Sequence, residues 1–246
     1  FITLRYARNL ASGHGFSFNP GQPSYGFTCP LWVMVLALFR LLGADLVLTA
    51  KVLGIAFGLS CLWVLYLAVR KMIDAPGFAF LVTLMFAYDP WFIRWSSSGM
   101  EAPLALLLIV LGFWFHVKEG DRLPVSSVLL GLATLARPEA GLFFALMVLE
   151  TARRRERRGK VWQSLVGYLC IVVPWLIFSL VRLGALTPNT LRAKYAVPGS
   201  PSFLLALAVR AGRVMGGTYL PYLLLILIVV ILPRFRSLAK SYLLPL

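Results

Sequence analysis

The sequence predicts an all-α protein that crosses a membrane several times. Hydrophobic residues make up 60% of the 246 residues and charged residues only 13%, and the mean hydropathy is +0.83. An average soluble domain has about 45–50% apolar and about 25% charged residues. Long uncharged apolar runs alternate with clusters of Lys and Arg. These observations exclude an ordinary water-soluble globule and predict about seven membrane segments with one juxtamembrane helix.

The charge balance is strongly basic, but it does not indicate a nucleic-acid partner. The formal net charge is +15, from 24 Lys and Arg against 9 Asp and Glu. A surplus of this size is typical of nucleic-acid-binding domains, yet such a domain does not keep long apolar runs in water. The three cysteines form neither a CxxC pair nor a Cys/His cluster, so no disulfide framework or zinc site is indicated. Because the chain begins at Phe1, we expect a fragment that lacks both ends.

The N-terminal third predicts a polar outer segment, a short helix and a first span. Residues 1–29 begin with helical periodicity and pass into Gly, Asn and Pro turns. Pro30 to Leu42 is too short to cross a hydrocarbon core of ~30 Å, which takes about 20 apolar residues. We expect it to be a juxtamembrane or re-entrant helix. Val52 to Val69 reaches the length of a span, and its Gly54 and Gly58 permit close helix packing.

The remaining apolar runs are predicted to pair into hairpins. In chain order they are Ala75 to Tyr88, Ala102 to Phe115, Leu123 to Ala136, Ala140 to Leu149, Trp162 to Val181 and Gly216 to Pro233. The basic clusters between them are Arg70 and Lys71; Lys118 and Arg122; Arg153 to Lys160; and Arg234 to Lys240. Cytoplasmic loops are enriched in Lys and Arg, so an even number of crossings separates successive clusters. The cluster at 153–160 is expected to anchor on anionic membrane lipid.

This topology leaves residues 1–29, 89–101, 137–139 and 184–202 together on the outer side. The hairpin of Leu123 to Leu149 has arms of only about 20 Å, at 1.5 Å per residue. Its turn, Arg137-Pro138-Glu139, therefore stops short of the outer surface. A charge at that depth is tolerated beside a partner or in a water-filled cavity. The alternative is an Arg137 that snorkels from a kinked helix.

Polar residues of these outer segments are the candidates for chemistry. A carboxylate and several cations at a membrane boundary suit a substrate with a lipid phosphate at one end and a group to be transferred at the other. Arg binds phosphate oxygens well, and a carboxylate can act as general base for an acceptor hydroxyl. The candidates are Arg5, Asn9, His14, Asn19, Arg94, Glu101, Arg137, Glu139, Asn189, Arg192 and Lys194.

Several of these candidates have a purely structural alternative. Glu101 begins an apolar run, where an acid suits a helix N-terminus, and Arg94 could simply pair with it. His14 is flanked by glycines and could be a turn residue. Arg192 and Lys194 could contact only lipid headgroups.

The first outer segment carries a series of short motifs. They are Arg5-Tyr6-x-x-Asn9, Gly13-His14-Gly15, Phe18-Asn19-Pro20-Gly21 and Thr28-x-Pro30-Leu31-Trp32. Together they resemble the first outer loop of bacterial GT-C glycosyltransferases, in the branch that includes mycobacterial terminal arabinofuranosyltransferases and is related to protein mannosyltransferases and aminoarabinose transferases. Weaker echoes are Ser98-Gly-Met-Glu101, Ala136-Arg-Pro-Glu139 and Pro188-Asn-Thr190 with Ala193-Lys194. At Pro23 to Tyr25 the chain departs from the pattern, because many relatives carry an acidic residue there.

The resemblance implies a single transmembrane glycosyltransferase domain of GT-C type over residues 1–246, in a bacterial inner membrane, with its active site on the periplasmic side. The donor would be a polyprenyl-phosphate sugar and the acceptor a cell-envelope glycan, lipid or protein. Glu101 resembles the second acidic position, and the principal acid would lie upstream of Phe1. Arg137, with Lys194 or Arg192, would meet the donor phosphate. Tyr6 joins the substrate-binding candidates. No cofactor is firmly implied, although a divalent cation could bridge carboxylates and phosphate.

Two other classes of function stay open at this point. A transporter or lipid flippase also needs charges at membrane depth, although many transporters show internal repeats and none is visible in this sequence. A non-catalytic polytopic scaffold is the third class. The sequence contains no Gly-rich nucleotide loop, which is consistent with a lipid-linked donor rather than a nucleotide sugar.

Overall fold

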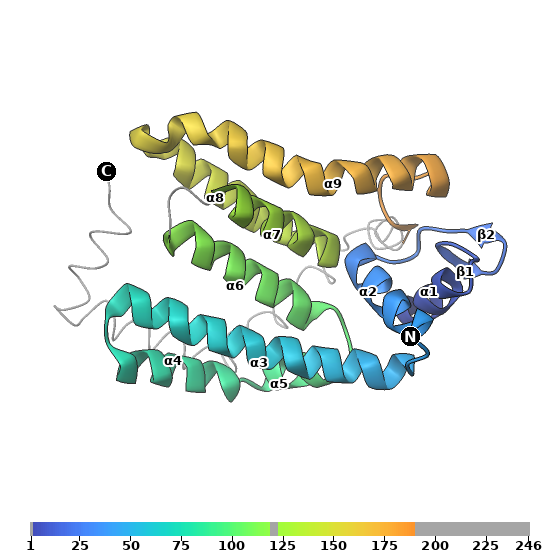
Figure 1. The fold of residues 1–246 in the computed structure, drawn as a ribbon, viewed down its shortest axis with the longest axis horizontal. Coiled ribbons are helices and arrows are strands. Elements are labelled where there is room, and N and C mark those ends of the chain that lie inside the picture. Colours follow the sequence, from blue (N-terminus) through green and yellow to red (C-terminus); the bar gives the residue numbers. More distant parts are fainter. Residues whose placement is uncertain (1, 119–122, 190–246) are drawn as a thin grey trace, which may run out of the picture.

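A computed structural model describes residues 2–118 and 123–189 as a bundle of roughly parallel and antiparallel helices with a small cap at one end (Figure 1). The elements are α1 (Ile2–Ala11), β1 (Ser17–Asn19), β2 (Gln22–Pro23), α2 (Pro30–Leu41), α3 (Leu46–Ile73), α4 (Pro76–Ala87), α5 (Pro90–Ser97), α6 (Ala102–Lys118), α7 (Leu123–Ala136), η1 (Pro138–Ala140), α8 (Gly141–Arg153), η2 (Arg155–Lys160) and α9 (Val161–Leu183). The all-α expectation holds, apart from the short antiparallel pair β1 and β2.

The two expected spans of sufficient length are present and are longer than predicted. Helix α3 has 28 residues and α9 has 23, and both are long and apolar enough to cross a membrane. Helices α4 and α5, bent by 63° at the break between them, make a third span if they are counted as one. The other apolar helices among the described residues are shorter than a span. The expected run from Gly216 to Pro233 lies outside the described residues.

Capping residues explain where the long helix α3 begins and ends. The Asp45 side chain accepts a hydrogen bond of 2.8 Å from the Leu48 backbone N–H, which satisfies one of the free donors of the first turn. Asp74 ends the helix in the left-handed conformation, with φ of 48°, and its N–H donates to the Arg70 carbonyl. The chain then reverses into α4 at Pro76, a residue well suited to a first helical position.

The segment 89–101 is largely helical, although the sequence suggested only a polar separator. Asp89 accepts a hydrogen bond of 2.7 Å from the Phe92 N–H, and Pro90 occupies the first turn, so the segment forms α5. Helix α5 packs on α3 at its two glycines. A Cβ at Gly54 would lie 2.6 Å from the Ser96 carbonyl oxygen, and one at Gly58 would lie 2.7 Å from the Ser96 hydroxyl. The GxxxG pair therefore serves packing within the chain.

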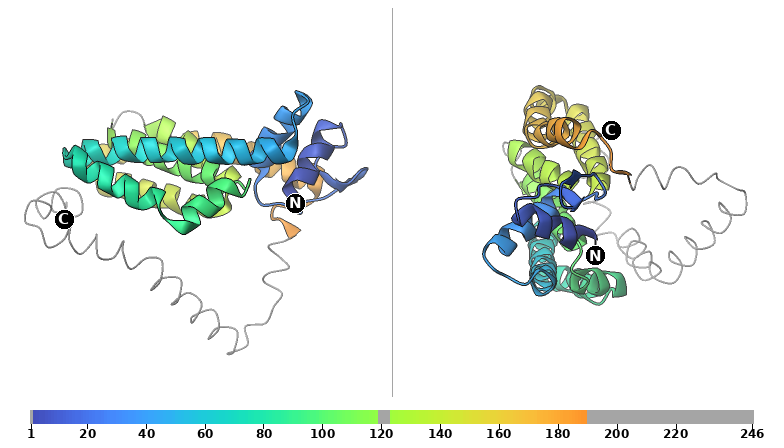
Figure 2. Two further views of the ribbon diagram at one scale, coloured as in Figure 1. Left: turned by 90° about the horizontal axis from the view of Figure 1, so that it is seen from below. Right: turned by 90° about the vertical axis from the view of Figure 1, so that its right-hand side faces the viewer.

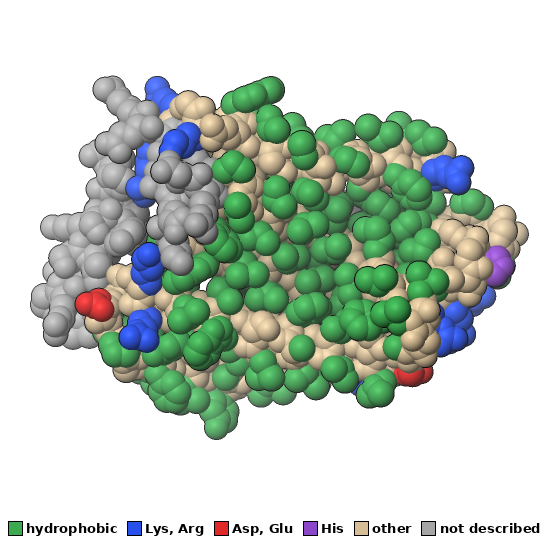
Figure 3. Space-filling model, viewed as in Figure 1, with side chains coloured by type: hydrophobic (Ala, Val, Ile, Leu, Met, Phe, Trp, Pro, Cys, Tyr) green, Lys and Arg blue, Asp and Glu red, His purple; other side chains and the backbone are tan. Residues whose placement is uncertain are grey.

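The bundle separates two kinds of loop (Figures 1 and 2). The cap end holds α1, β1, β2 and α2 together with the α5–α6 turn, the α7–α8 turn and the C-terminus of α9. The opposite, basic end holds the α3–α4 turn, with Arg70 and Lys71, and the α8–α9 turn at residues 153–160. Hydrophobic side chains cover most of the face between them (Figure 3). The two basic clusters that the structure describes thus share one end of the bundle, whereas the clusters at Lys118–Arg122 and Arg234–Lys240 lie wholly or mostly outside the described residues.

Candidate active site at the cap end

The two helices of the α7–α8 hairpin are about half as long as α3. Helix α7 has 14 residues and α8 has 13, or about 20 Å each, whereas the 28 residues of α3 extend about 42 Å. Figure 1 shows the cap-end turn of this hairpin set back from the ends of α3 and α9. Pro138 breaks the helix there, and Arg137 before it is extended, with φ of −147°. The turn therefore lies short of the cap-end termini of the two long helices; its depth in a membrane stays a prediction.

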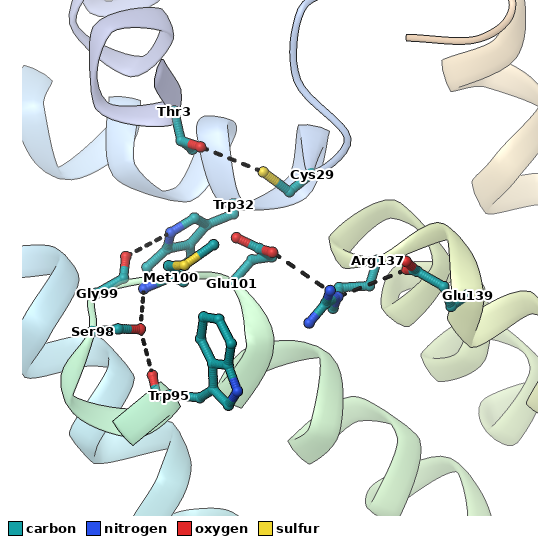
Figure 4. A network of polar contacts seen from close by, with 10 residues as sticks. All are labelled: Thr3, Cys29, Trp32, Trp95, Ser98, Gly99, Met100, Glu101, Arg137 and Glu139. Atoms are coloured by element: carbon teal, nitrogen blue, oxygen red, sulfur yellow. Dashed lines mark hydrogen bonds and ion pairs between the residues drawn. The ribbon is translucent and has the colours of Figure 1, made fainter. Parts of the chain in front are cut away.

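Arg137 lies between two carboxylates (Figure 4). Its Nε is 4.0 Å from Glu101 Oε1 and 3.7 Å from Glu139 Oε2. The Glu101 side chain is only 8% exposed, whereas that of Glu139 is 72% exposed. A mostly buried carboxylate requires a partner, and Arg137 supplies it. Arg137, whose side chain is 43% exposed, thus joins the buried Glu101 to the exposed Glu139.

Arg94 does not form the ion pair with Glu101 that the sequence analysis considered as an alternative. It is exposed on α5, and its guanidinium lies over the rings of Trp91 and Trp95, at 5.4 Å and 5.9 Å from their centroids. Cation–π contacts of this kind are worth about 0.5–1 kcal/mol at exposed sites.

The turn between α5 and α6 fixes the position of Glu101. Gly99 adopts φ of +74°, a conformation that favours glycine, and its carbonyl accepts a hydrogen bond of 3.2 Å from the Trp32 indole N–H. The Ser98 hydroxyl donates to the Trp95 carbonyl at 2.8 Å and accepts from the Met100 N–H at 3.3 Å. The Glu101 carbonyl then accepts the first hydrogen bond of α6, from Ala105. Glu101 therefore lies at the N-terminus of α6, which is also the position expected if its role were purely structural.

The two members of the Glu101–Arg137 pair line different cavities. The larger, of about 630 Å³, lies between α5, α6 and the start of α8; Arg137 and Glu139 provide its charged lining together with Asp89, and most of its wall is apolar. Trp91, Phe92, Trp95, Ile109 and Phe143 are among its apolar side chains. The smaller, of about 480 Å³, lies between the N-terminus of α1, residues 26–32 and the α5–α6 turn, and Glu101 lines it. The ion pair therefore stands between a mainly apolar cavity and a smaller, more polar one.

Cys29 and Trp32 were not predicted to contribute to this site beyond their place in a motif. Cys29 is 3% exposed and lies in the smaller cavity, with its sulfur 3.7 Å from the Thr3 hydroxyl. Burial raises the pKa of the Cys29 thiol to about 12, and the nearby Glu101 carboxylate acts in the same direction. The thiol is therefore protonated at neutral pH, whereas a nucleophilic cysteine requires a thiolate. The pairing of Trp32 with Gly99 spans 67 residues, which sequence periodicity does not reveal.

The first-loop candidates are brought together with one another and hold the loop in shape. The Asn9 side-chain amide, 8% exposed, donates to the carbonyls of Ser17 at 2.8 Å and Phe18 at 3.0 Å. The buried Tyr6 hydroxyl shares a hydrogen bond of 2.7 Å with Ser24 and accepts one of 3.1 Å from the Gly26 N–H. These two side chains line neither cavity.

The other first-loop candidates lie on the surface of the same loop. The Arg5 guanidinium donates to the Asn19 side-chain oxygen at 3.0 Å and lies 4.1 Å from the centre of the Phe18 ring. His14 is exposed in the turn, and its backbone N–H donates to the Asn9 carbonyl at 2.9 Å. The structure does not bring them to Glu101 or Arg137, since neither cavity is lined by them.

The C-terminal candidates are only partly described. The exposed Asn189 is tied to the first loop by its backbone N–H, which donates to the Tyr25 carbonyl at 2.8 Å. Tyr25 is itself buried, which raises the pKa of its hydroxyl, and it accepts a hydrogen bond of 3.1 Å from the Trp175 indole of α9. Arg192 and Lys194 lie outside the described residues.

Within residues 2–118 and 123–189, no group of three or more His, Cys, Asp or Glu side chains could hold a metal ion. His116, expected to be structural, lies at the basic end with its Nε2 2.9 Å from Glu150 Oε2. No model of a known protein family, no curated protein and no solved structure matches this chain.

Proposed function

We propose that this chain is part of a membrane glycosyltransferase of GT-C type that transfers a sugar from a polyprenyl-phosphate donor to a glycan, lipid or protein acceptor of the cell envelope. The observation that supports this proposal most strongly is the Glu101–Arg137 pair between two cavities of different character. A lipid-linked donor and a polar acceptor differ in the same way as the two cavities do.

The larger cavity suits the donor. Its walls are aromatic and aliphatic, and Arg137 places a cation beside them. A polyprenyl phosphate combines an apolar chain with a charged phosphate, and an Arg fork binds phosphate oxygens through several N–H groups. The indole faces of Trp91 and Trp95 offer flat surfaces on which a sugar ring can stack. We assign the donor phosphate to Arg137, with Lys194 or Arg192 as further cations.

The reaction is a single displacement at the anomeric carbon. The oxygen of the acceptor hydroxyl forms the new bond to that carbon while the bond from carbon to the phosphate oxygen breaks. Polyprenyl phosphate leaves with the electron pair, and the hydroxyl proton passes to a carboxylate. Arg137 stabilises the negative charge that develops on the leaving phosphate. Glu101, which lines the smaller cavity, accepts a hydrogen bond from the acceptor and orients it.

The membrane placement belongs to the same proposal. We infer about seven membrane segments in a bacterial inner membrane, with the cap end in the periplasm and the basic end in the cytoplasm. Support comes from the two long apolar helices, the bent pair α4–α5 and the two basic clusters, Arg70 with Lys71 and residues 153–160, that share one end of the bundle.

The test is sugar transfer by the full-length protein from a radiolabelled polyprenyl-phosphate sugar to a cell-envelope acceptor fraction. We expect Arg137→Ala to lower kcat by about 100-fold or more, because one donor to the developing charge is lost, and Glu101→Gln to lower kcat/KM for the acceptor. Arg182→Ala is the matched control, since Arg182 is an exposed cation of α9 at the cap end of the bundle and lines neither cavity.

Full activity in both the Arg137→Ala and the Glu101→Gln variants would overturn the assignment of the site. Transbilayer movement of the lipid without sugar transfer would support the transporter or flippase class instead.

A further inference from the structure

A third cavity, at the basic end, lies outside the candidate active site. It is a groove of about 230 Å³ between the C-terminal turns of α3 and the C-terminal half of α6. Nearly all of its surface is apolar, and the side chains that line it are Leu65, Ala68, Val69, Lys71, Met72, Val110, Phe113, Trp114 and Val117. Water is poorly held in a groove that lacks polar partners, so an apolar ligand fits this groove better than water does.

Lys71 gives the groove one charged wall. It is exposed, it lines the cavity, and the exposed Arg70 is its neighbour on the last turn of α3. Asp74, three residues after Lys71, is acidic, so the net charge of Arg70, Lys71 and Asp74 is positive.

The carboxylate on the far side of α6 is already engaged. Glu150 of α8 is 2.9 Å from the His116 ring and forms an ion pair with Arg154. His116 and Glu150 do not line the groove. Among the residues that the structure describes, the charge at the groove is therefore the cationic charge of α3.

We propose that this groove binds an anionic phospholipid, with one acyl chain between α3 and α6 and the headgroup phosphate at Lys71 and Arg70. The apolar wall matches the acyl chain, and the cations match the phosphate, whose negative charge no headgroup cation offsets in an anionic phospholipid. Basic pockets between membrane helices bind anionic headgroups in this manner. The site is independent of the proposed sugar transfer, because it lies at the opposite end of the bundle.

The probes are phosphatidylglycerol and phosphatidylcholine with identical acyl chains, added to the purified full chain in detergent and counted by native mass spectrometry. A cation near a membrane surface contributes about 1 kcal/mol to binding of anionic lipid, which is about a fivefold preference. Because Lys71 and Arg70 are both placed at the phosphate, we expect phosphatidylglycerol to bind up to about 30-fold more tightly than phosphatidylcholine, and Lys71→Ala to lower that preference by about fivefold. Ala68→Trp fills the groove and is expected to weaken the binding of both lipids.

Arg158→Ala is the matched control, because Arg158 is exposed at the same end but does not line the groove. Because the cluster at 153–160 also attracts anionic lipid but does not line the groove for the acyl chain, the lipid preference of Arg158→Ala should fall by much less than that of Lys71→Ala. Equal loss in Arg158→Ala and Lys71→Ala would overturn the proposal, since it would indicate general attraction to a basic surface. Unchanged binding in Ala68→Trp, or equal binding of chain-free glycerophosphoglycerol, would also overturn it. Thermal unfolding of each variant in detergent verifies that the compared proteins are folded.

Discussion

At the scale of single residues, the cap end contains two kinds of polar side chain that look alike in the sequence. Asn9 and Tyr6 satisfy backbone groups of the first loop, whereas Glu101 and Arg137 face cavities. A buried polar group that is fully used in local hydrogen bonds has little left to offer a substrate. The motif Arg5-Tyr6-x-x-Asn9 is therefore explained by the shape of the loop, whatever chemistry the loop supports.

Replacing Asn9 tests this distinction. Asn9→Ala leaves the Ser17 and Phe18 carbonyls without their side-chain donor, so we expect the free energy of unfolding to fall by about 1–3 kcal/mol. His14→Ala, at an exposed turn position of the same loop, is expected to change it by less than about 0.5 kcal/mol. Thermal unfolding in detergent measures both. If Asn9→Ala abolished sugar transfer with unchanged stability, Asn9 would instead belong to the active site.

At the scale of elements, close contact between α3 and α5 sets the geometry of the site. Gly54 and Gly58 let the α5 backbone approach α3, and the Trp32–Gly99 hydrogen bond fixes the turn that follows α5. Glu101 begins the next helix, so its position depends on this packing. A pair of glycines that resembles a common dimerisation motif serves here to place an acidic side chain.

A single methyl group at Gly54 is enough to test the packing of α5 on α3. In Gly54→Ala the new Cβ would lie 2.6 Å from the Ser96 carbonyl oxygen, so one of the two helices must move. We expect the free energy of unfolding to fall by about 1–3 kcal/mol. Gly77→Ala is the control, because no atom lies within 4 Å of the Cβ it would add. Equal stability of the two variants, measured by denaturant unfolding in detergent micelles, would contradict the close packing.

At the scale of the whole molecule, the two ends of the bundle differ in charge and in complexity. Among the described residues, the basic end holds the short α3–α4 and α8–α9 connections. The cap end carries a folded loop structure anchored to α9 by the Trp175–Tyr25 hydrogen bond and by ring contacts of Trp175 with Phe16 and Phe27. Cysteine labelling determines which end faces which compartment. In a background with Cys29, Cys61 and Cys170 replaced by alanine, we expect His14→Cys to react with a membrane-impermeant maleimide in intact cells and Arg158→Cys to react only after permeabilisation. The reverse pattern would contradict the proposed orientation.

The sequence predicted those features that depend on composition and on local breaks. Apolar runs identified the helices, and Arg137-Pro138-Glu139 identified the recessed turn, because proline and two charges interrupt an apolar segment. The helix α5 was missed, since a run of polar and aromatic residues at 89–101 carries no clear period. The pairing of Glu101 with Arg137 could not be predicted either, because residues 36 positions apart leave no local signal in the sequence. Tertiary packing alone brings these two residues together.

The short α7–α8 hairpin has an electrical consequence. In a membrane, the transmembrane voltage falls across the low-dielectric layer, and a unit charge that crosses all of it changes in energy by about 2.3 kcal/mol per 100 mV. An anion that docks at Arg137 must travel part of that way, because the turn is set back from the ends of α3 and α9. The occupancy of this site by a phosphate would therefore respond to the energisation of the membrane, even though no ion is transported.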